Sequence, residues 1–185
     1  IRVSDWVTSW LRVETGAAMD RLREYAATGA PREVSRDYLA VDSSVSARLA
    51  GDRLAVTVAG GWWTPPAGGR HFGTGTLLAS WRSTVDPAAS AWSAASGIGA
   101  TSLSAPPALW LGAGTGEGRV ALLRAHRLVN DGVVTGPAFG RGLAHASIEY
   151  AHPVTHPRKG ALSIAGFGDA AQAWHRLNGL DTSAL

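Results

Sequence analysis

Asp169 is the residue whose type and setting most clearly require a chemical partner. It is the single charged residue between Lys159 and His175, in a stretch that alternates like a β-strand. An unpaired charge in such a strand is costly, so the sequence predicts a cationic partner from elsewhere in the fold. Arg124 is the best candidate, because a planar guanidinium can bind a carboxylate through two hydrogen bonds. The chemistry expected of this pair is an ion-pair contact between two distant segments.

Other arrangements that could do chemistry are weaker, and we predict no catalytic residue and no enzyme activity. Gly-x-Ser-x-Gly does not occur, and 95–97 (Ala-Ser-Gly) comes nearest but lacks the leading glycine. His145 and Ser147 leave open a hydrolase built on the wall of a β-barrel, since such a site needs geometry and not a local motif. The sequence gives that alternative no positive support.

Neither a metal site nor a cofactor site is predicted. His152 and His156 are four residues apart, but Pro153 and Pro157 disfavour the helix that would place both imidazoles on one face. These residues are predicted to form a turn. The glycine-rich run 112–118 lacks the Gly-Lys-Ser/Thr ending of a phosphate-binding loop and is predicted to be the flexible stem of a loop.

Composition restricts the fold class more than the function. The 185 residues are 45% hydrophobic, and we find no run of roughly 18 apolar residues that could form a membrane helix. A soluble β-rich domain and a β-barrel remain, and eight Trp with 23 Gly favour the barrel. The 17 basic residues are dispersed, so the net charge of +3 does not predict nucleic-acid binding. The absence of cysteine fits an envelope protein without disulfides and a reduced cytoplasm equally well. Because the chain starts at Ile1 without a leader, we expect it to be part of a longer protein.

Strict alternation predicts one hairpin over residues 37–63, turning at Gly51-Asp52. Six apolar residues are expected on one shared face: Val41, Val45, Leu49, Leu54, Val56 and Val58. Further strands are predicted around 11–17, 76–82, 90–103, 144–150 and 161–174, which makes seven. In the last of these, Asp169 lies on the parity opposite to the aliphatic side.

The predicted connections alternate in length, and this favours a barrel over a sandwich. Connections at 19–36, 64–71 and 104–140 are long, whereas those at 51–52, 84–89 and 155–160 are short. Tight turns on the periplasmic side and loops on the outside are typical of outer-membrane barrels. Residues 16–27 show some helical spacing but are predicted to be an external loop. Four tryptophans near strand ends suggest an aromatic girdle, although a packed β core would also use them: Trp62, Trp63, Trp81 and Trp174.

Two motifs resemble those of one family. The pattern Phe167-x-Asp169-x-Ala171-x-x-Trp174 resembles an F-x-D-x-G strand motif, and Arg124-Ala125-His126 resembles an R-G-aromatic loop motif. Both belong to the outer-membrane barrels called bacterial surface antigens, which include the barrel-assembly insertase and the two-partner secretion transporters. The resemblance implies that the loop folds into the barrel lumen and that Arg124 pairs with Asp169. The chain departs from the pattern because Ala125 and Ala171 replace glycines and His126 replaces Phe or Tyr.

The sequence therefore predicts an all-β protein, with residues 1–185 forming part of one antiparallel transmembrane β-barrel of meander topology and about seven strands. A long inward-folding loop is expected at about 104–140. The resemblance implies polypeptide insertion or translocation in a Gram-negative outer membrane, with membrane lipid and unfolded polypeptide clients as partners. Two alternatives stay open: a plain porin-like channel, which does not need the Arg124–Asp169 contact, and a soluble secreted β-sandwich binding module.

Overall fold

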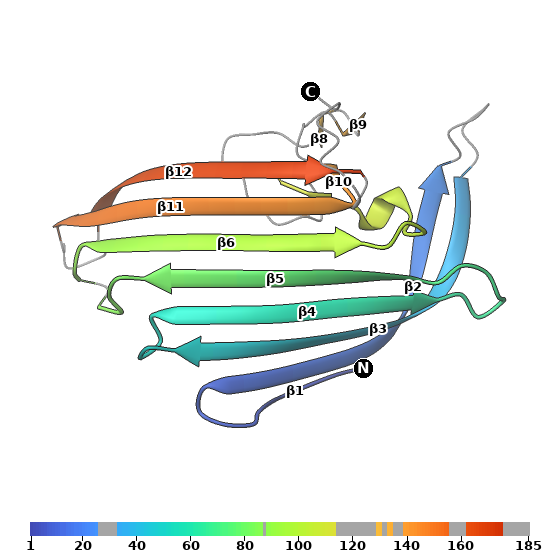
Figure 1. Ribbon diagram of the computed structural model, residues 1–185, viewed down its shortest axis with the longest axis horizontal. Coiled ribbons are helices and arrows are strands. Elements are labelled where there is room, and N and C mark those ends of the chain that lie inside the picture. Colours follow the sequence, from blue (N-terminus) through green and yellow to red (C-terminus); the bar gives the residue numbers. More distant parts are fainter. Residues whose placement is uncertain are drawn as a thin grey trace.

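A single antiparallel sheet of eight strands dominates the computed structural model, in the order β1-β2-β3-β4-β5-β6-β11-β12 (Figure 1). The structure describes residues 1–25, 33–86, 88–113, 129–130, 133–134, 139–155 and 162–175. The strands are β1 (Arg2–Trp6), β2 (Leu11–Tyr25), β3 (Glu33–Leu49), β4 (Leu54–Thr64), β5 (Phe72–Arg82), β6 (Ala91–Thr101), β11 (Gly142–Thr155) and β12 (Leu162–Trp174). The predicted all-β class and antiparallel meander are confirmed.

The remaining elements are small. A 3-10 turn η1 (Pro107–Leu109) follows β6, and β7 (Leu111–Gly112) pairs with β10 (Phe139–Gly140). A second ladder joins β8 (Val129–Asn130) to β9 (Val133–Val134). Over the described part of the chain, no helix has both the length and the apolar character needed to cross a membrane.

The predicted hairpin over 37–63 is confirmed. β3 and β4 pair antiparallel with Val45 opposite Val58 and Leu49 opposite Leu54, so the six predicted apolar residues do share one face. The turn is longer than the two residues predicted and runs from Ala50 to Arg53. Gly51 has φ 64°, a left-handed conformation that favours glycine, and Asp52 has the same φ.

The prediction of an external loop over 19–36 is wrong for residues 19–25 and 33–36, and the count of seven strands is wrong too. β2 continues to Tyr25 and β3 starts at Glu33, because their backbones pair in register up to these residues, and the Arg21 guanidinium lies 2.7 Å from the Asp37 carboxylate. Residues 26–32 lie outside the described residues. Helical spacing in 16–27 concealed this strand. The eighth strand, β1, was not predicted, since its five residues show little apolar alternation.

Two ends of the sheet can be distinguished. At the turn end lie the connections 7–10, 50–53 and 83–90, together with the β11–β12 connection, and at the loop end lie the β2–β3, β4–β5 and β6–β11 connections. The predicted sorting into short and long connections is only partly kept, because 83–90 is no shorter than 65–71. The sheet is not closed: β1 and β12 are its edge strands, and β1 pairs only with the first part of β2.

In the described part of the chain, the buried apolar clusters lie at the loop end of one face of the sheet. Tyr38 and Phe72 are buried there with their ring centroids 5.0 Å apart, and Ala105 packs onto them from the segment that follows β6. The Ser104 hydroxyl donates a hydrogen bond to the His71 carbonyl at 2.8 Å, which ties that segment to β5. Figure 1 shows the far ends of β2 and β3 bending up beside this segment. The chain after β6 thus folds back over the sheet.

Candidate functional site

One face of the sheet is apolar across seven neighbouring strands. The registers of all ladders place alternate residues of β2 to β12 on this side, which we call the apolar face. Its larger exposed side chains are Val13, Met19, Leu39, Val41, Val45, Leu49, Val58, Trp62, Leu77, Trp81, Trp92, Ile98, Ile148, Tyr150 and Ile164. Val58, Ile98 and Ile148 are each about half exposed, at 55%, 50% and 51%. From β2 to β12, the described residues of this face include no charged side chain within the apolar region. On the two outer strands this region runs from Leu11 to Met19 on β2 and from Ile164 to Trp174 on β12.

Aromatic side chains bound the apolar face at both ends of the strands. Trp81, Trp92 and Tyr150 form a row at the turn end, and the rings of Trp92 and Tyr150 lie 4.9 Å apart. At the loop end, Trp62 lies over Gly73 and Trp174 over Gly142, where an added Cβ would collide with the indole. Because Trp81 pairs with Leu54, the two rows are separated by the eight residue steps from Leu54 to Trp62. At ~3.4 Å per residue and a strand tilt of about 40°, this corresponds to an apolar height of roughly 20 Å.

Beyond the loop-end row, the same side of β2 and β3 becomes charged. Arg21 donates from its Nε to Asp37 at 2.7 Å and from its second nitrogen at 3.2 Å. These hydrogen bonds hold the pKa of Asp37 below its usual range. Trp63 does not belong to either row, which corrects the prediction of a girdle position. Its side chain lies on the other face, stacks on Phe72 and donates a hydrogen bond to Asp20 at 2.9 Å.

The opposite face, which we call the polar face, carries most of the charged side chains of the sheet. On β1 to β3 they form a network in which Glu14 lies 3.3 Å from both Arg2 and Arg12, and Arg2 lies 3.3 Å from Asp42. Gly16 makes room for this network, because a Cβ there would meet the Asp42 carboxylate. The alternation of apolar and polar residues thus separates two surfaces of opposite character.

Asp169 lies on the polar face, directly opposite Ser147 of β11. Phe167 pairs with Glu149 and Ala171 with His145 on the same face, whereas Trp174 belongs to the apolar face. Neither Asp169 nor Glu149 is without an interaction in the structure. The loop motif Arg124, Ala125 and His126 lies outside the described residues. The Arg124–Asp169 contact therefore stays a prediction.

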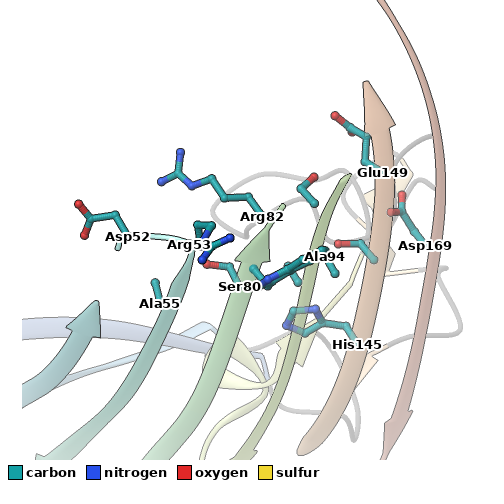
Figure 2. A pocket seen from close by; sticks show the side chains of 13 residues that line it. Asp52, Arg53, Ala55, Ser80, Arg82, Ala94, His145, Glu149 and Asp169 are labelled. Atoms are coloured by element: carbon teal, nitrogen blue, oxygen red, sulfur yellow. The ribbon is translucent and has the colours of Figure 1, made fainter. Parts of the chain in front are cut away.

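A cavity of about 600 Å³ occupies the turn end of the polar face (Figure 2). Glu149 and Asp169 line one side of it, and Arg53 and Arg82 line the other. Between them lie small and polar side chains of β5, β6 and β11: Ser80, Ser93, Ala95, His145 and Ser147. One side of the cavity thus carries the two arginines, with Asp52 beside them in the turn before β4, and the other side carries the carboxylates of β11 and β12.

The arginine half of this cavity was not predicted, although a signal for it exists in the sequence. Arg53 follows the predicted turn at Gly51-Asp52, and Arg82 comes just before the turn with Asp86, both on the parity opposite to the apolar residues. The register of β4 and β5 pairs Leu54 with Trp81, and one further residue brings Arg53 opposite Arg82. The Arg82 amide donates to the Arg53 carbonyl at 2.8 Å.

The hydrolase alternative concerns His145 and Ser147. His145 and Ser147 are on the same face of β11, but no hydrogen bond joins their side chains in the described part of the chain, and a nucleophile and its base need one. Gly97 leaves the space that the His145 and Leu78 side chains occupy, so this region is tightly filled.

The histidines at 152 and 156 are also placed differently from the prediction. His152 lies in strand β11 and not in a turn, with its Nδ1 2.7 Å from the Ser90 hydroxyl. His156 lies outside the described residues. Within the described ranges, no group of three or more His, Asp or Glu side chains is arranged to hold a metal ion.

Comparison with known proteins adds no relative. No family model matches the chain, and no curated protein matches it. The resemblance to bacterial surface antigens therefore rests on the motif residues alone.

Proposed function

We propose that this chain forms part of the wall of a transmembrane β-barrel in a bacterial outer membrane. In this proposal the apolar face contacts lipid and the polar face lines a water-filled lumen. The observation that carries it is the charge-free apolar face on seven neighbouring strands, bounded by aromatic residues at both ends. Its height of roughly 20 Å is close to the ~25 Å apolar band of outer-membrane barrels.

In water, exposure of the apolar face would be energetically unfavourable. Soluble monomers rarely expose continuous apolar patches larger than a few hundred Å². A β-sandwich would cover the apolar face with a second sheet. Outside the main sheet, the described strands form only two ladders of two strands each, and the buried apolar clusters lie on the polar face. This argues against the soluble binding module.

The eight-stranded sheet is open, so a closed barrel needs further strands between β1 and β12. A bilayer does not tolerate unpaired backbone groups, so in this proposal further strands pair with β1 and with β12. They can come from a longer protein or from other copies of the chain.

Polypeptide insertion or translocation is the finer part of the proposal. It is supported by Asp169 on the polar face and by the segment after β6, which packs against Tyr38 and Phe72 on that same face. We propose that this segment continues into the lumen and that Arg124 meets Asp169 there, beside the path of an unfolded polypeptide. A plain channel would share the wall but would not need this contact.

The wall is tested by placing one arginine on either face of β3 in the complete protein. Val45→Arg puts a charge on the apolar face and is expected to destabilise the folded barrel by about 2–4 kcal/mol near the bilayer midplane. Ser44→Arg is the matched control, because Ser44 lies on the polar face opposite Glu14 and its arginine can pair with that carboxylate. Folding into lipid vesicles, followed by the heat-dependent gel shift, reports both. Equal effects of the two arginines would contradict the proposal.

A further inference from the structure

Arg53, at the end of the turn before β4, and Arg82, at the end of β5, form a pair of neighbouring like charges. Their backbones are joined by the 2.8 Å hydrogen bond from the Arg82 amide, and both side chains line the cavity of about 600 Å³ at the turn end (Figure 2). Ser93 lies opposite Arg82 on its other side. Two arginines and at least one serine thus line the same part of the cavity.

Among the described residues, neither arginine of this pair has a carboxylate partner in an ion pair. Arg2 and Arg12 each have carboxylate partners, and Arg48 lies 4.8 Å from the centroid of the Trp6 ring. By contrast, no described carboxylate lies within ion-pair distance of Arg53 or Arg82, although Asp52 lines the same cavity. The Arg53 Nε donates to the Ala50 carbonyl at 3.2 Å. Like charges placed directly opposite each other on a sheet destabilise it, and a bound anion would offset this.

We propose that Arg53 and Arg82 bind an oxyanion, either the carboxylate of an acidic polypeptide segment or a phosphate. The inference rests on the proposed function in one respect, namely that the polar face is the lumen through which such a ligand reaches the turn end. Guanidinium groups bind carboxylate and phosphate through paired hydrogen bonds. The ligand class follows from that chemistry.

The carboxylates that line the cavity lie on other strands than Arg82. Glu149 on β11 is two strands away from Arg82, and Asp169 on β12 is three strands away. Both carboxylates have interactions of their own in the structure.

The test uses the complete protein in detergent micelles at low salt, with binding followed by calorimetry. Three probes are titrated: inorganic phosphate, an acetylated peptide of aspartates and the matching peptide of asparagines. We expect the phosphate and the aspartate peptide to bind and the asparagine peptide not to bind. The double variant R53Q/R82Q should lose roughly tenfold in affinity for each arginine removed. The matched control R21Q/R70Q removes two charges away from the cavity and should bind like the parent.

Each result has a fixed meaning. Unchanged anion affinity in R53Q/R82Q, or equal loss in R21Q/R70Q, overturns the inference. Binding of phosphate without the aspartate peptide supports the anion site and overturns the polypeptide source. Anion binding is measured in detergent, whereas the Val45→Arg test measures folding into lipid. The two tests can therefore give different outcomes, which separates a failure of the anion site from a failure of the proposed barrel wall. The gel shift of each variant confirms that it is folded.

Discussion

The two faces of the sheet are built from the same strands and differ in almost everything else. On β3, Val41 and Val45 project into the apolar face, while Asp42 and Ser44 between them project into the polar face. On β2 to β12 the apolar face has no charge between its aromatic rows, and on β1 the same side carries Asp5 opposite Val13. The polar face carries a four-residue ionic network and a charged cavity. The alternation of apolar and polar residues along each strand is therefore enough to give one sheet an apolar face and a polar face.

The largest expected effect is a loss of stability when a buried ring on the polar face is removed. The comparison is with an exposed apolar side chain on the apolar face. Phe72 is 1% exposed beneath the segment that follows β6, so Phe72→Ala should destabilise the protein by about 3–5 kcal/mol. Leu77, on the apolar face of the same strand, is 45% exposed and contacts lipid in our account. Leu77→Ala should cost well under half as much, measured by urea unfolding in vesicles. Equal costs would mean that the apolar face is packed against protein.

The second comparison tests whether the polar face holds the long loop. Arg124→Ala, Asp169→Ala and the double variant form a thermodynamic cycle, with protease sensitivity of the loop as the readout. We expect a coupling energy of about 0.5–3 kcal/mol, toward the lower end if water fills the lumen. Strictly additive effects would remove the pairing and leave a plain channel.

A smaller effect is expected in the ionic network near β1. Glu14→Gln removes the partner of Arg2 and Arg12, but Arg2 is 64% exposed, so the loss should be under about 1 kcal/mol and should shrink further in high salt. Thermal unfolding at two salt concentrations measures it. A loss as large as that of Phe72→Ala would show that this part of the polar face is dry.

The smallest effect concerns the Arg21–Asp37 pair beyond the apolar face. Its hydrogen bonds lower the pKa of Asp37, so the contact is present above the pKa that Asp37 has in the unfolded chain and is lost as the pH falls through the lower folded pKa. NMR titration of the Asp37 carboxyl carbon should give a lower midpoint than the same titration of the Arg21→Gln variant. Identical midpoints would show that the pair does not form in solution.

The sequence predicted those parts of the fold in which apolar and polar residues alternate strictly. The β3–β4 hairpin follows from Val45, Val58 and the glycine turn, and the parity of Asp169 follows from its uncharged strand. β1 and the far half of β2 were missed because their residues are small, polar or helix-compatible, and only pairing with a long neighbour makes them strands.

The site was predictable to a smaller extent, because side chains that meet across strands depend on register. Trp63 was expected at the lipid interface, yet one residue step from Trp62 places it on the polar face against Phe72. Arg53 and Arg82 meet only through the pairing of β4 with β5. The parity of both arginines can be read from the sequence, but their proximity follows only once the register of β4 and β5 is known.

The most direct test of the central claim is the accessibility of alternate residues on β4 in lipid vesicles. The chain has no cysteine, so single cysteines in place of Ala55, Val56, Thr57 and Val58 can each carry one spin label in a full-length protein without other cysteines. The account predicts that labels at 56 and 58 collide with oxygen dissolved in the lipid, and that labels at 55 and 57 collide with a water-soluble nickel chelate in the lumen. Equal accessibility at all four positions, or water contact at 56 and 58, would contradict it.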